Sequence, residues 1–222
     1  MESSKQISAD LKSILLEKHL NFELLNTYKG VPFVCKVVLE VVEDEAACFG
    51  LGPASSFAWG TVEHTLILSE GLLEPIEAHM QRFDRAARAI WVDHFVYAGS
   101  KLSNRKELRV EPEGVVEVLL EADGEEQVAT LVDLSMRGAG VRVTEELPAS
   151  VIPGKILDLR LRLPEGELGL AGKIRNLIKS DHATRLSIEF TGTLPNKAPI
   201  VRFIMRRRAE IMAEMQQMSA RE

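Results

Sequence analysis

The sequence predicts a mainly β fold made of two small β-barrel or split-barrel domains, with one helix at the N-terminus and one at the C-terminus. Three observations lead to this prediction. Short apolar and β-branched runs recur along the chain at roughly 8–12-residue spacing. Gly, Pro, Asp and Glu separate these runs, whereas a helical period occurs only near the two ends. A chain of 222 residues is long enough for two such domains.

The first half of the chain begins with a predicted helix over residues 4–20, in which Ile7, Leu11 and Ile14 recur at three- and four-residue steps. Gly30 and Pro32 mark the end of the helical pattern. The strands expected after it, each bounded by turn residues, cover residues 31–42, 47–52, 60–68, 76–83 and 88–97. Together these elements predict a first domain over residues 1–98.

The second half repeats the strand pattern and ends in a helix. Its expected strands cover residues 114–121, 127–134, 140–144, 155–163, 167–178 and 183–191. The run at 155–163 alternates most regularly, with leucine at every second position, so those leucines should share one face. A helix should start near Asn196 to Pro199. A polar stretch without a period precedes these strands, which predicts a linker at 99–109 and a second domain over 110–222.

Charge and composition exclude several classes of function. Residues 1–100 carry eight Lys and Arg against 14 Asp and Glu, whereas residues 101–222 carry 19 of each, so the net charge of −6 lies in the first half. Bulk nucleic-acid binding needs a basic surface and is not expected. No apolar run reaches the ~20 residues of a membrane span, and no signal segment is evident. Cys35 and Cys48 have no metal-ligand spacing, which fits reduced thiols and a cytoplasmic protein.

Two short motifs carry the chemistry of the second half. Arg105 and Arg109 form an R-x-x-x-R string, and Asp133, Ser135 and Gly138 form a D-x-S-x-x-G string about one hairpin later. A guanidinium fork can pair bidentately with a phosphate or with the O6/N7 edge of guanine. A carboxylate and a hydroxyl can bond ring N–H groups, and glycine admits close backbone approach. This set suits a small phosphorylated purine ligand.

The two motifs, in this order and spacing within a β context, resemble those of the PilZ domain, the receptor family for the bacterial second messenger cyclic di-GMP (c-di-GMP). The resemblance runs from Ser103 to the C-terminus. It implies that Arg105 and Arg109 bind guanine edges and phosphates. It further implies that Asp133 and Ser135 bond the other side of the ligand and that Gly138 keeps the turn open. Asn104, just before the motif, leaves open whether one or two c-di-GMP molecules bind. The N-terminal half resembles, by architecture alone, the leading domain of YcgR-type flagellar brake proteins.

Each motif also has a purely structural interpretation. An arginine pair at a strand entrance can be a solvated pair, and Asp and Ser can cap a turn by bonding nearby backbone. Without the arginines, the turn interpretation of D-x-S would be preferred. Phosphate-cradling loops and nucleophile elbows are missing from the sequence, so no catalytic residue is expected. No metal site is expected either, because the histidines have no ligand spacing; they are His19, His64, His79, His94 and His182.

The expected function is therefore a cytoplasmic, non-enzymatic c-di-GMP receptor with no cofactor other than this ligand. Ligand contacts to both the linker and the barrel would change the arrangement of the domains. The output would be a contact with a protein partner in flagellar or envelope machinery, affecting motility or biofilm formation. The chain could act as a monomer or a homodimer. Two alternatives remain open: a PilZ-fold adaptor that does not bind nucleotide, and a ligand-controlled transcription regulator.

Overall fold

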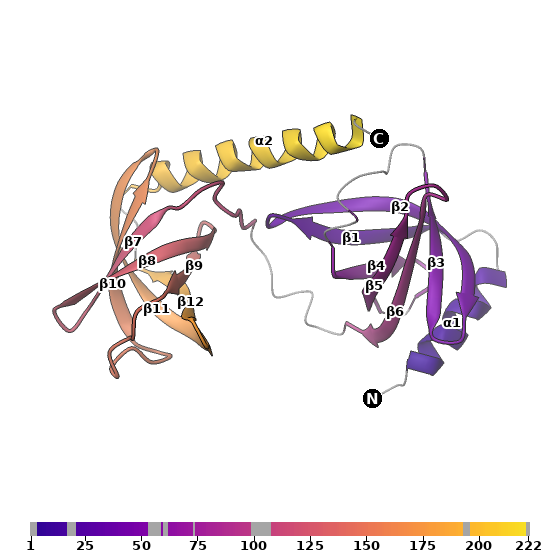
Figure 1. Cartoon of the computed structure of the whole chain (residues 1–222), viewed down its shortest axis with the longest axis horizontal. Helices are drawn as coiled ribbons and strands as arrows, with labels where there is room; N and C mark the ends of the chain where they lie inside the picture. The colour runs from indigo at the N-terminus through magenta and orange to yellow at the C-terminus, as the bar shows by residue number, and fades with distance from the viewer. Residues whose placement is uncertain are drawn as a thin grey trace. The chain divides into compact units, whose positions relative to one another are not determined.

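A computed structural model of the chain describes residues 4–16, 21–52, 59, 62–72, 74–98, 108–192 and 196–220. Two compact units are found. The first comprises Met1–Tyr28, Pro32–Lys106 and Ile211–Glu222, and the second comprises Lys29–Val31 and Glu107–Glu210. Each unit contains one closed antiparallel barrel of six strands (Figure 1). The predicted fold class, two barrels with a helix near each end of the chain, is confirmed.

The first barrel has the strand order β1-β2-β3-β6-β5-β4. Its strands are β1 (Phe22–Tyr28), β2 (Val31–Glu43), β3 (Ala46–Leu51), β4 (His64–Ser69), β5 (Ile76–Asp84) and β6 (Ala89–Tyr97). Along β2 inward-facing apolar residues alternate with exposed ones over most of its length, whereas β3 is buried at almost every position. Phe49, Ile67 and Ile90 are fully buried in the core. The helix α1 (Ser4–Leu16) buries Ile7 and Leu11 and packs against β6. On β6, Tyr97 donates a hydrogen bond to Asp10 at 2.8 Å.

The sequence pattern does not predict β1, which is the main difference from expectation in the first unit. Phe22, Leu24 and Asn26 are the inward-facing residues of this strand. Asn26 is buried and its side-chain amide donates to the hydroxyl of Thr65 at 2.9 Å. A polar side chain facing the core interrupts the apolar alternation by which a strand is recognised, and only its partner on β4 accounts for its burial.

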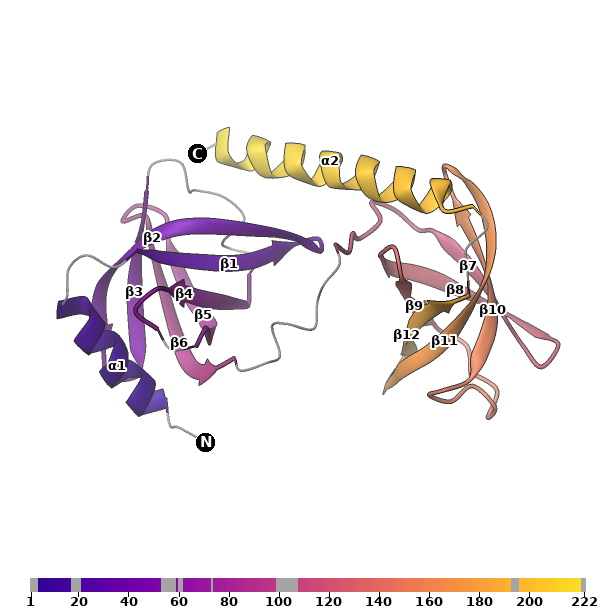
Figure 2. The ribbon, with the colours of Figure 1, turned by 180° about the vertical axis from the view of Figure 1, so that it is seen from behind.

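The second barrel, seen from behind in Figure 2, has the strand order β10-β11-β12-β9-β8-β7. Its strands are β7 (Glu117–Ala122), β8 (Glu125–Leu134), β9 (Gly138–Val143), β10 (Ile156–Leu163), β11 (Gly166–Ser180) and β12 (Ala183–Thr191). The leucines of β10 all face inward, as the alternation predicts. Asp123 and Gly124 form the tight turn between β7 and β8, with φ of 54° and 83°. Backbone at such positive φ favours a primed hairpin turn.

The helix α2 (Ala198–Ala220) follows the second barrel, and its first half belongs to the second unit. Ile200 and Phe203 are buried, and so is Arg207, with an exposed fraction of 2%. The guanidinium of Arg207 donates from Nε to the carbonyl of Glu111 at 2.8 Å and pairs through Nη1 with Glu210 at 3.0 Å. A buried charge held this way ties the helix to the segment that enters the barrel.

Neither α1 nor α2 combines the length and the apolar content that crossing a bilayer would require. The division of the chain into domains at 1–98, 99–109 and 110–222 stays a prediction. Most of the expected linker, residues 99–107, lies outside the described part of the chain, and Arg105 lies there with it.

Candidate functional site

The site is built on the outer face of the second barrel, at the end of β8. Along β8 and β9 the register shifts between Leu131 and Asp133, which marks a bulge. Leu131 and Leu134 face the core, while the Asp133 side chain lies on the outer face opposite Gly140. The side chain of Asp133 is only 10% exposed, so its carboxylate needs partners.

Those partners are two arginines, one on each carboxylate oxygen. Arg109 Nη1 lies 3.0 Å from Asp133 Oδ1, and Arg185 Nη2 lies 2.8 Å from Asp133 Oδ2. The arginine side chains are 48% and 50% exposed. One nearly buried carboxylate therefore orients two half-exposed guanidinium groups, whose remaining N–H donors stay open to solvent. We call these three residues the Arg-Asp-Arg clamp.

Arg109 is held in place by the residue that follows it. Val110 is fully buried and forms an isolated antiparallel bridge with Leu134, with both N–H to O=C distances at 3.0 Å. Because Asp133 precedes Leu134 on β8, this bridge positions Arg109 beside the carboxylate. The second arginine of the R-x-x-x-R motif is thus part of the barrel in this structure.

Gly140 explains how Arg185 reaches Asp133. The strand β9 lies between β8 and β12, so side chains from β8 and β12 must cross it to meet. A Cβ at Gly140 would lie 2.5 Å from Asp133 Oδ2, closer than packing allows. Glycine at this position therefore leaves room for the carboxylate. Arg185 spans the remaining distance from β12, since strands two apart are separated by roughly 9–10 Å.

Ser135 and Gly138 close the turn between β8 and β9. Ser135 is buried; its backbone N–H donates to the Gly138 carbonyl at 2.8 Å, and its hydroxyl donates to the same oxygen at 3.2 Å. The Arg137 N–H donates to the Ser135 hydroxyl at 3.4 Å. A Cβ at Gly138 would lie 2.4 Å from the Ile188 carbonyl oxygen. The structure thus gives Ser135 a turn-capping role and makes Gly138 a point of close strand contact.

Among the predicted site residues that the structure describes, three lie at the corner between β8 and β9: Asp133, Ser135 and Gly138. Arg109 contacts Asp133 there. Arg185 was not predicted, because no motif marks it and 52 residues separate it from Asp133. The residue directly opposite Arg185 on β9 is Arg142. Like charges opposite each other on a sheet are unfavourable, and a bound anion would relieve this.

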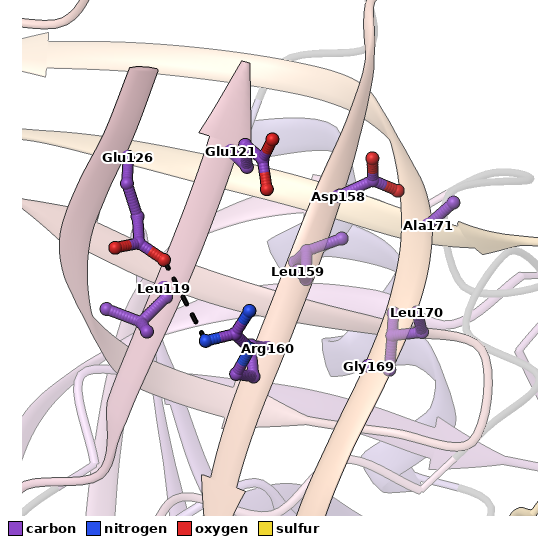
Figure 3. A pocket seen from close by; sticks show the side chains of 9 residues that line it. All are labelled: Leu119, Glu121, Glu126, Asp158, Leu159, Arg160, Gly169, Leu170 and Ala171. Atoms are coloured by element: carbon purple, nitrogen blue, oxygen red, sulfur yellow. Dashed lines mark ion pairs between the residues drawn. The ribbon is translucent and has the colours of Figure 1, made fainter. Parts of the chain in front are cut away.

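A second feature of this barrel is a hollow of about 370 Å³ over the strands β7, β8, β10 and β11 (Figure 3). Arg160 points across it toward Glu126, and the carboxylates of Glu121 and Asp158 lie on the same wall. Three carboxylates against one guanidinium make this surface unfavourable for a phosphorylated ligand. It contains none of the predicted site residues, so the clamp is the stronger candidate.

Comparison with known proteins identifies the second barrel. Residues 103–206 match the family model of the PilZ domain. The second barrel is a PilZ domain. The matched range includes both motifs and the Arg-Asp-Arg clamp. The family resemblance predicted from the two motifs is therefore confirmed.

Three solved structures align with most of this chain. MrkH of K. pneumonia in complex with c-di-GMP has 14% identity and a TM-score of 0.49, covering 96% of this chain and 98% of that one. YcgR from Escherichia coli in complex with c-di-GMP has 18% identity and a TM-score of 0.47, covering 96% of both chains. The Bacillus subtilis inhibitor of motility MotI/DgrA has 14% identity and a TM-score of 0.43, covering 86% and 96%. No curated protein matches the sequence.

Proposed function

We propose that this protein is a non-enzymatic, cytoplasmic receptor for c-di-GMP. The observation that carries the proposal is the Arg-Asp-Arg clamp, which presents two oriented, half-exposed guanidinium groups on the outer face of a PilZ barrel. Arg105, Arg109, Asp133, Ser135 and Gly138 are the proposed ligand-binding residues, and Arg185 is added to them. Two solved relatives, MrkH and YcgR, are complexes with c-di-GMP.

The chemistry of the clamp suits this ligand. c-di-GMP has two phosphates and two guanine bases, and each guanine presents the O6/N7 acceptor pair that an arginine fork matches. Asp133 already occupies one N–H of each arginine, so the carboxylate acts mainly by holding the forks in place. Pre-oriented donors lose less conformational entropy on binding than free side chains do, which favours affinity.

Signalling would follow from where the arginines lie. Arg105 belongs to the predicted linker, whereas Asp133 and Arg185 belong to barrel strands. A ligand that contacts both sets favours conformations in which the linker lies on the barrel, and this would change the arrangement of the two units. Couplings of this type are typically ~1–3 kcal/mol. The output we propose is a contact with a protein partner in motility, biofilm or envelope machinery.

Calorimetry with c-di-GMP on the full-length protein tests the proposal. We expect binding at micromolar affinity or better, which corresponds to about −8 kcal/mol or more favourable. We also expect c-di-AMP to compete poorly, because adenine has a donor where guanine has O6. Equal displacement by the two nucleotides would mean that the arginines contact phosphates alone. Absence of c-di-GMP binding would instead favour the adaptor that does not bind nucleotide.

Hydrogen exchange and small-angle scattering test the proposed switch separately. With c-di-GMP bound, amides in residues 98–109 should exchange more slowly, because ligand contacts must hold this segment against an entropic cost of ~1–2 kcal/mol per residue. The scattering profile should change as well. Tight binding with unchanged exchange at 98–109 and unchanged scattering would exclude the linker switch while leaving the binding proposal intact.

A further inference from the structure

A cluster of imidazole and carboxylate groups lies on the outer face of the first barrel, in a part of the chain to which the proposed receptor function assigns no role. His79 on β5 pairs with His64 on β4 and with Asp93 on β6, as directly opposed residues of adjacent strands. His94 follows Asp93. The Nδ1 atoms of His79 and His94 lie 3.0 and 2.8 Å from the same oxygen, Asp93 Oδ1.

The backbone of β6 departs from regular geometry to make this cluster. Consecutive residues of a strand face opposite sides of a sheet, so Asp93 and His94 would normally diverge. His94 instead has φ of 52°, and the β5–β6 register shifts by one residue between Glu77 and His79. Val92 and Phe95 therefore both face the core, while Asp93 and His94 both point outward.

Holding a histidine in the left-handed region is costly, by roughly 1–2 kcal/mol. Such bulges and strained residues are concentrated at functional sites, where they direct a side chain toward a particular target. Here the side chains converge on one place. One possible ligand atom from each of His79, Asp93 and His94, a ring nitrogen or a carboxylate oxygen, lies within 4.8 Å of the other two. His64 adds a third imidazole, with its ring 5.6 Å from that of His79 in an edge-on arrangement.

Two imidazoles and a carboxylate are the donor set of a late transition metal. Zn²⁺ binds nitrogen and carboxylate oxygen at about 2.0–2.2 Å, so tetrahedral ligand atoms lie roughly 3.3–3.6 Å apart. The two Nδ1–Oδ1 separations, 2.8 and 3.0 Å, are shorter than this range, and all three ligand atoms lie within 4.8 Å of one another. Small side-chain rotations would bring them to it. Mg²⁺ and Ca²⁺ prefer oxygen ligands and do not match two imidazoles.

We propose that His79, Asp93 and His94 form a Zn²⁺ site on the first barrel, with His64 or water as the fourth ligand. This differs from the expectation drawn from the sequence, which found no metal-ligand spacing among the histidines. Successive histidines of the set His64, His79 and His94 are separated by 15 residues along the chain. Strand pairing brings His64 and His79 together, and the β-bulge at His94 adds the third. The site is independent of c-di-GMP binding.

Titration of the untagged, full-length protein with ZnCl₂ in metal-free buffer tests the site. We expect one Zn²⁺ per chain with a dissociation constant in the micromolar range or below. His79→Gln, Asp93→Asn and His94→Asn should each weaken binding by about tenfold or more. Asn is chosen at position 94 because it tolerates left-handed backbone, which preserves the bulge. His64→Ala should have a smaller effect if water can replace the imidazole.

His182→Ala is the matched control, since His182 is an exposed histidine of the second barrel. It should bind Zn²⁺ as the unaltered protein does. Histidine ring resonances in NMR spectra give a readout that needs no variant: those of His79 and His94 should shift on adding Zn²⁺, and that of His182 should not. Binding weaker than about 100 µM overturns the site. Binding that survives both His79→Gln and His94→Asn overturns it equally.

Discussion

Replacing Arg109 with alanine should abolish measurable c-di-GMP binding and leave the fold intact, and Arg105→Ala should do the same. Each substitution removes charge-assisted hydrogen bonds worth roughly 1.5–3 kcal/mol apiece, so the loss of two bonds lowers affinity by at least about 100-fold. Arg109 is half-exposed, and its described side-chain contact is with Asp133. Asp133 keeps its pair with Arg185 in this variant, so the fold should survive, with some loss of stability because the Asp133 carboxylate is nearly buried. Calorimetry, combined with thermal unfolding of each variant, measures both effects.

Arg160→Ala is the matched control for this prediction. Arg160 is 49% exposed, nearly the same as Arg109, and it lies on β10 beside the acidic hollow. Its removal should leave c-di-GMP affinity unchanged. Unaltered affinity in both Arg105→Ala and Arg109→Ala would contradict the assignment of the site. An equal loss in Arg160→Ala would point to a general effect of positive charge.

Gly138→Ala should have the largest effect on stability among the motif residues. A Cβ at this position would lie 2.4 Å from the backbone oxygen of Ile188, so β9 and β12 would have to separate. Overpacking of this kind costs roughly 1–3 kcal/mol. For a domain of this size, Tm falls by about 4–8 °C for each kcal/mol. Because Gly138 also accepts the hydrogen bonds of Ser135, ligand binding should weaken with it.

Gly169→Ala tests whether the effect depends on position. Gly169 is also a strand glycine of the second barrel, on β11, but no heavy atom lies within 4 Å of the place its Cβ would occupy. This substitution should change stability little or raise it slightly, since it reduces the freedom of the unfolded chain. Thermal unfolding of the two variants under identical conditions compares them. Equal destabilisation would show that the Ile188 contact is not the cause.

Much of the fold could be predicted from local patterns. The alternating leucines of β10 identify a half-buried strand, and the period of Ile7 and Leu11 identifies α1. Local patterns failed at β1, because Asn26 faces the core and is satisfied by Thr65 on another strand. A hydrogen bond between residues 39 positions apart has no signature within either segment.

The candidate site, too, could be predicted from local patterns only in part. The sequence alone determined the two motifs, and through them the PilZ family and the proposed ligand, because these residues lie within one hairpin of each other. Only the tertiary structure brought Arg185 to Asp133 across Gly140, and only it joined His79 to Asp93 and His94. The physical reason is strand register. Motif chemistry is encoded by neighbours along the chain, whereas contacts across a barrel depend on which strands pair and in what alignment.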